Sequence, residues 1–308
     1  MYPYLKRYRY TAADIPPQTY RRRHTAGEEE SMDQEKLRSL IKEHKLSDFQ
    51  SEIIANARPA VYISLDEAEQ GEIGRSRIGG TPDLPPSIPW PNEPNWGYRC
   101  FLLQINFAEL PKFESSPFPD TGMLYLFVNE GESDADQVIF YNGEESLQAT
   151  VAPDADEMLT DWYDEVVVHT LKLEAGLDIP HWSSDAFEEM ESLLGGSNEN
   201  SDRLDELSRA LSKGSVGRLL GYDEGIGQDV KENAYVVREH NSKWLYDYEQ
   251  RKQIDMTGAR KWRNLLLLYS NWEIELVFGD SGYLEVLVHA DDLKSMDLSR
   301  AYVTLESS

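Results

Sequence analysis

Apolar and polar residues alternate in two different rhythms along the chain. Apolar positions three or four residues apart, as at Leu37, Leu40 and Ile41, predict an amphipathic helix that begins near Met32. A second helix follows around Phe49 to Ile54. The same spacing predicts further helices over residues 185–194 and 204–211, with a flexible polar linker at 196–200 between them.

Short apolar runs bounded by turn residues predict β-strands over much of the remaining chain. They cover residues 61–65, 100–105, 122–128, 138–141, 165–173, 235–237, 264–269, 274–278 and 282–289. Together with the helices, these strands predict an α+β fold of mainly antiparallel sheets with flanking helices.

One strand contains a polar residue within an apolar run. A period of two along residues 101–106 places Phe101, Leu103 and Ile105 on one face and Gln104 on the other. A buried Gln needs hydrogen-bond partners. We therefore expect Gln104 either to bind the backbone of a loop, the more frequent case, or to face a ligand.

Three short motifs recur in the same order in both halves of the chain. The matched pairs are Arg77–Gly80 with Arg218–Gly221, Phe101–Asn106 with Leu265–Ser270, and Pro119–Leu124 with Gly279–Leu284. This match aligns Gln104 with Leu268. The spacing of these motifs is irregular for a repeat. Their common order nevertheless predicts an internal duplication of a β-rich unit. The expected single domain, residues 32–308, then consists of two related halves at about 32–195 and 215–308, joined by a helical and linker segment.

Charge is unevenly distributed along the 308 residues, whose formal net charge is −26. Residues 1–24 carry a net charge of +5, whereas residues 113–202 carry −21. Such a negative field repels nucleic-acid phosphate and anionic lipid, and attracts basic proteins or cations. It is also typical of a solvated surface that only keeps a protein in solution. The expected partner is a basic protein, and neither nucleic acid nor a membrane is expected to bind the folded domain.

The termini and cysteine content indicate the compartment. Residues 1–31 have the composition of a flexible basic tail, and Met32 is an alternative start. The tail lacks the apolar region of a secretory signal, and no run of about 18 apolar residues follows. Cys100 is the single cysteine, is expected in the core, and excludes an intramolecular disulfide. These features favour a cytoplasmic protein. They do not predict the oligomeric state.

The segment Gly79–Pro91 is rich in Gly and Pro, which together specify one rigid loop. The simpler interpretation is a loop that packs Leu84 and Trp90 onto a sheet. The functional interpretation is the rim of a preorganised binding pocket. Its candidate ligand-binding residues are Arg77, Gly80, Asp83, Trp90 and Gln104.

Catalytic and metal-binding motifs are weak. The six histidines have no metal-site spacing, and no nucleophile elbow occurs. Asp134 to Asp136 and Asp154 to Glu157 could attract Ca²⁺, but both lack the pattern of an EF-hand, which favours solvated loop acids. The sequence therefore predicts no catalytic residue, no metal and no cofactor, and it favours a protein that is not an enzyme.

Several ordered motifs resemble the YwqG-like family, a bacterial domain of unknown function. They are Gly79–Pro85, Trp90-Pro91, Phe101–Leu110 and Pro119–Leu124, followed more loosely by Leu219–Tyr222, Gln228-Asp229 and Gly279–Gly282. The resemblance covers roughly residues 35–305. It implies an α+β fold with antiparallel sheet and an internally repeated layout, and no established activity. Some members lie near toxin genes, which implies an immunity-like or partner-binding role by association alone.

Two functional hypotheses follow. The first is a non-catalytic protein-binding module for a basic partner, in an immunity-like role in its narrowest form. The alternative is a small-molecule or metal-dependent enzyme, or a ligand-binding protein, with its site at the Gly79–Pro91 loop.

Overall fold

The computed structural model describes residues 32–93, 97–113, 116–129, 137–153, 166–226 and 229–307. The basic tail and, within the acidic stretch 113–202, residues 114–115, 130–136 and 154–165 lie outside these residues, and the acids at 134–136 and 154–157 are among them. No helix in the described ranges is long and apolar enough to cross a membrane.

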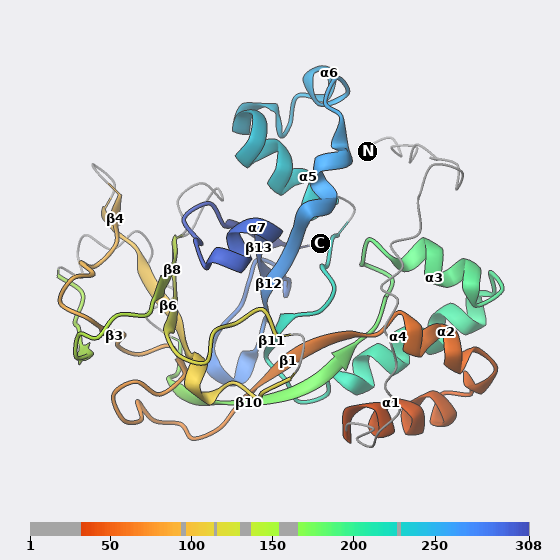
Figure 1. Ribbon diagram of the computed structural model, residues 1–308, viewed down its shortest axis with the longest axis horizontal. Helices are drawn as coiled ribbons and strands as arrows, with labels where there is room; N and C mark the ends of the chain where they lie inside the picture. The colour runs from red at the N-terminus through yellow and green to blue at the C-terminus, as the bar shows by residue number, and fades with distance from the viewer. Residues whose placement is uncertain are drawn as a thin grey trace.

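A curled, ten-stranded antiparallel sheet dominates the fold and confirms the predicted α+β class (Figure 1). Its strands, from one edge to the other, are β14 (Tyr302–Glu306), β13 (Tyr283–His289), β12 (Trp262–Tyr269), β11 (Gly217–Leu220), β1 (Arg58–Leu65), β10 (His169–Asp178), β2 (Arg77–Ile78), β6 (Cys100–Asn106), β7 (Met123–Val128) and β8 (Gln137–Tyr141). Two small ladders accompany it, formed by β3 (Asp83–Leu84) with β9 (Gln148–Ala149) and by β4 (Asn92–Glu93) with β5 (Gly97–Tyr98).

A helical layer lies at one end of the long central strands β1 and β10 (Figure 1). It contains α1 (Met32–Glu43), the short 3₁₀ turn η1 (Ser47–Phe49), α2 (Gln50–Ala55), α3 (Phe187–Leu193) and α4 (Asn198–Leu211). Buried leucines of α1 and α4 pack with Tyr62 of β1 and with Ile179, which directly follows β10. These helices were predicted, but the expected linker at 196–200 is wrong in part, because α4 already begins at Asn198.

A second helical group follows β11 and projects from the sheet in Figure 1. Its members are α5 (Val230–Tyr235), the π-helix η5 (Val236–Asn241), the 3₁₀ turn η6 (Ser242–Trp244), α6 (Tyr248–Arg251) and the 3₁₀ helix η7 (Met256–Lys261). The strand predicted at 235–237 is wrong: this apolar run is helical because its side chains pack with Val230 and Trp262.

The strand predicted at 274–278 is also wrong. Asn271 exchanges two backbone hydrogen bonds with Leu276, which closes a tight turn around the 3₁₀ helix η8 (Trp272–Ile274). The remaining predicted strands are present, with β10 starting at His169 and extending to Asp178. The sequence prediction missed α7 (Ala290–Ser295), β14 and the short ladders.

The main core lies on one face of the sheet and includes side chains from both halves of the chain. Cys100 belongs to it and is 1% exposed, as predicted. The predicted face of Phe101 is wrong, because a β-bulge between Phe101 and Leu103 shifts the alternation of side chains. Phe101 packs with Leu84 and Tyr125 on the opposite face, while Leu103 stays in the main core.

On each side of the central pair β1 and β10, four further strands follow one another in chain order from the centre of the sheet to its edge. Outward from β1 lie β11, β12, β13 and β14, and outward from β10 lie β2, β6, β7 and β8. The internal duplication stays a proposal, which this order supports. By strand register Arg77 faces Gln104 and Arg218 faces Leu267. Under the proposed duplication this register matches Gln104 with Leu267, whereas the sequence match aligns Gln104 with Leu268.

Candidate functional site

Three of the five predicted site residues meet in one buried network. Arg77 on β2, Asp83 on β3 and Gln104 on β6 are each 0% exposed. Nη2 of Arg77 lies 2.5 Å from Oδ1 of Asp83. Arg77 also donates from Nε and Nη2 to the carbonyl of Thr81, at 3.0 and 2.7 Å, and from Nη1 to the carbonyl of Gln70 at 3.1 Å. The guanidinium is thus engaged by protein groups on every nitrogen.

Gln104 joins this loop to the sheet. Its Oε1 accepts from the backbone nitrogen of Asp83 at 2.8 Å. Its Nε2 donates to Oδ2 of Asp83 at 2.9 Å and to the carbonyl of Arg75 at 2.8 Å. The expectation that Gln104 binds the backbone of a loop is confirmed.

The two glycines give the loop its shape. Gly79 and Gly80 have φ of +69° and +72°, which side chains rarely adopt. A Cβ on Gly80 would lie 2.3 Å from Oε1 of Gln70, which accepts from the nitrogen of Thr81. This close approach encloses the Arg77 guanidinium.

Trp90 has a packing role in this structure. Its Nε1 donates to the carbonyl of Arg99 at 2.8 Å, and its ring centroid lies 5.3 Å from that of Phe127. Leu84 belongs to the same apolar cluster. These contacts agree with the simpler interpretation, in which the loop packs Leu84 and Trp90 onto the sheet.

A second buried network surrounds Arg218 on β11. Its Nη1 donates to Oε1 of Glu224 at 3.0 Å and to the hydroxyl of Tyr269 at 2.5 Å. Its Nη2 donates to the carbonyl of Tyr222 at 2.7 Å, and its Nε lies 3.2 Å from Oδ2 of Asp178. Arg77 and Arg218 are used alike, because each donates to the carbonyl four residues ahead and pairs with the carboxylate six residues ahead.

Glu285 distinguishes the second network from the first. This side chain of β13 is 0% exposed, and the backbone nitrogen of Glu224 lies 3.3 Å from its Oε2. Burial raises the pKa of the Glu285 carboxyl well above its usual range, and the neighbouring Asp223 and Glu224 raise that pKa further. The sequence reasoning missed Glu285, although an acid inside an apolar strand was a usable signal.

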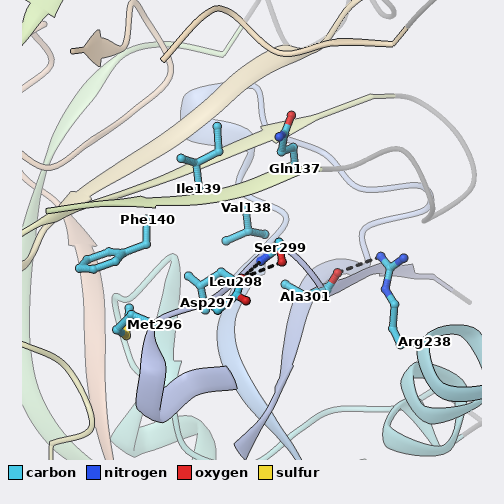
Figure 2. A pocket seen from close by; sticks show the side chains of 10 residues that line it. All are labelled: Gln137, Val138, Ile139, Phe140, Arg238, Met296, Asp297, Leu298, Ser299 and Ala301. Carbon is cyan, nitrogen blue, oxygen red and sulfur yellow. Dashed lines mark hydrogen bonds between the residues drawn. The ribbon is translucent and has the colours of Figure 1, made fainter. Parts of the chain in front are cut away.

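One surface cavity lies beside the edge strand β8. Figure 2 shows Val138 and Phe140 of β8 facing the segment that contains Met296 and Leu298. The cavity measures about 360 Å³, and Arg238 bridges its rim by donating to the carbonyl of Ala301 at 2.8 Å. Both apolar and polar side chains line this cavity, and its lining residues include no histidine.

A second cavity, of about 330 Å³, lies where β1 ends at Leu65 and β10 starts at His169. It is lined by Leu65, Asp66, His169, Asn271, Glu273 and the backbone around Ser215. Within the described ranges, no three or more His, Cys, Asp or Glu side chains are placed to hold a metal ion. No sequence motif marked this cavity, because its lining comes from four distant segments.

Comparison with family models identifies the larger part of the chain. Residues 76–306 match a family described as "Domain of unknown function (DUF1963)". The chain belongs to this family. The DUF1963 region begins one residue before Arg77 and contains the core residues of both arginine networks, whereas α1, α2 and β1 precede it. A comparison with curated proteins gives no match. The expected domain of unknown function is confirmed, and the narrower YwqG-like name stays a prediction.

Proposed function

We propose that the chain is a non-catalytic protein-binding module whose partner is a basic protein. The observation that carries this proposal is a run of exposed carboxylates on the loop after β1, at Asp66, Glu67, Glu69 and Glu72. None of the four forms an ion pair with a described residue. The nearest following base, Arg75, pairs with Glu109 instead, at 3.3 Å.

Glu273 of η8 and Glu275, which directly follows η8, add two further carboxylates, and Glu273 lines the same cavity as Asp66. Both are exposed, and neither has an ion-pair partner in the described ranges. An uncompensated field of this kind accelerates encounter with a positively charged partner and disfavours nucleic acid. The chain's net charge of −26 adds the same long-range bias. We also propose that the protein is cytoplasmic and that its protein-binding role is immunity-like.

The alternative, a small-molecule or metal-dependent site at the Gly79–Pro91 loop, has less support. Arg77, Asp83 and Gln104 are enclosed and already bonded to one another or to backbone. A ligand at this loop would have to displace those bonds. A closed network of this kind is what a loop anchored to its sheet requires.

Capture from lysate tests the proposed function. The immobilised protein is expected to enrich basic proteins at about 0.05 M salt and to release them at about 0.5 M, because surface charges are screened over a few ångströms at high salt. A matched column carries the variant in which Asp66, Glu67, Glu69 and Glu72 are all changed to their amides. If both columns enrich the same proteins, or neither enriches a basic one, the proposal fails.

A further inference from the structure

We propose that the cavity between β1, β10 and η8 receives an ammonium or guanidinium group from a Lys or Arg side chain of the basic partner. The inference rests on the proposed function and adds the place and chemistry of the principal contact. Asp66 contributes one carboxylate to this cavity and Glu273 another, while no Lys or Arg lines it. We call it the cation pocket.

His169 points to a ligand independently of the acids. It lines the pocket although its side chain is only 7% exposed. Its Nδ1 lies 3.0 Å from the carbonyl of Val167. Because a carbonyl only accepts, Nδ1 carries the proton of the neutral ring, which leaves a lone pair on Nε2. Nε2 has no hydrogen-bond partner among the described residues, so this mostly buried side chain of the pocket lining keeps one acceptor without a donor.

Backbone contacts fix the rest of the pocket. The nitrogen of Asp66 donates to the carbonyl of Thr170 at 2.9 Å, and the nitrogen of Glu273 donates to Oδ1 of Asn271 at 2.9 Å. The nitrogen of Val167 donates to the carbonyl of Ile274 at 2.9 Å, which ties η8 to the segment before β10. The carboxylates therefore stand on an ordered frame, and little further ordering is needed on binding.

An exposed aromatic residue, Trp272, lies next to the pocket lining in the sequence. It directly precedes Glu273 and is 71% exposed. Exposed Trp beside carboxylates favours Arg or Lys, because the indole face attracts cations and Trp is enriched among dominant interface residues. The cavity volume of about 330 Å³ is near the lower limit for ligand pockets, which suits one side chain better than a cofactor.

Binding of a fluorescent nine-residue arginine peptide tests the cation pocket. The variant Asp66→Asn with Glu273→Gln is expected to weaken binding by at least about tenfold, since close charge pairs at interfaces couple strongly. The control is Glu144→Gln with Glu145→Gln, which removes the same charge from exposed positions outside both the pocket and the acidic surface. We expect this control to weaken peptide binding by less than about threefold, because only the long-range electrostatic field changes. Equal losses in the two variants would overturn the proposal, and so would absence of peptide binding to the wild type.

Two further measurements distinguish a side chain of a protein partner from a free small cation as the group that binds in the pocket. Arginine amide should compete with the peptide only weakly, because a partner supplies more contacts than one side chain. Competition at equal concentration would overturn the partner assignment in favour of a free small cation. The ¹⁵N resonance of His169 Nε2 is expected to shift on addition of the peptide, and an unchanged resonance would contradict the proposed contact without any substitution.

The outcomes also separate this inference from the proposed function. If basic proteins are captured but the pocket and control variants release them equally, the function stands and the pocket is wrong. If the peptide occupies the pocket but no basic protein is captured, the pocket stands and the protein-binding function is wrong.

Discussion

Arg77→Met is expected to lower the free energy of unfolding by about 3–5 kcal/mol, the usual cost of removing one partner of a buried ion pair. Asp83 is 0% exposed and would be left without the guanidinium that lies 2.5 Å away. The carbonyl of Gln70 would lose its donor as well, and the carbonyl of Thr81 would keep only Nε2 of Gln70. Urea unfolding measures the change.

Arg75→Met is the matched control for this variant. Arg75 is partly exposed and pairs with Glu109 at 3.3 Å, so its loss should cost less than about 1 kcal/mol. Its backbone carbonyl, which accepts from Gln104, remains. The double variant Arg77→Met with Asp83→Asn should recover part of the loss, because the stranded charge is gone. Equal destabilisation by Arg77→Met and Arg75→Met would show that the enclosed network does not anchor the loop.

Glu285→Gln is expected to make the protein more stable above neutral pH and to flatten its stability profile. The pKa of Glu285 is raised in the folded state by burial, whereas the unfolded chain titrates near the ordinary value of about 4.3. The folded state therefore holds a proton that the unfolded state has lost. Its stabilising effect is complete below about pH 4.3 and disappears as the pH rises towards the elevated folded pKa. Gln mimics the neutral acid at every pH.

Unfolding free energies of wild type and Glu285→Gln from pH 4 to 9 test this expectation. Their difference should grow with pH by up to about 1.4 kcal/mol per pH unit, the limit for one proton. Other titrating groups cancel in the difference. Glu144→Gln, which removes an exposed carboxylate, should follow the wild type throughout. A pH-independent difference for Glu285→Gln would mean that Glu285 is ionised in the folded protein.

The local sequence pattern was sufficient for most strands and for the partners of Gln104. A Gln inside an apolar strand must be satisfied, and the Gly-Pro loop beside it supplies the backbone that satisfies it. The pattern failed at 235–237, where three apolar residues suit a strand or a helix and tertiary packing decides. It also failed at Phe101, because a bulge shifts the register and the alternation gives no sign of it.

The cation pocket was beyond sequence reasoning for a different reason. More than one hundred residues separate Asp66 from His169, and more than one hundred separate His169 from Glu273. None of the three belongs to a recognisable motif. Asp66 and His169 meet because β1 pairs antiparallel with residues 171–178 of β10, which places the end of β1 near the start of β10. Glu273 joins them because Val167, just before β10, donates to the carbonyl of Ile274 in η8. The predicted ligand residues around Arg77 were easier to find, since Gly and Pro mark their loop, yet their contacts suit anchoring.

The affinity of the purified protein for a captured basic partner, measured at about 0.05 and 0.5 M salt, tests the proposed function most directly. The wild type should bind tightly at low salt and far more weakly at high salt. The variant that carries amides at Asp66, Glu67, Glu69 and Glu72 should bind weakly at both. Equal affinity of the two proteins, or an affinity that salt leaves unchanged, would contradict recognition of a basic partner by this acidic surface.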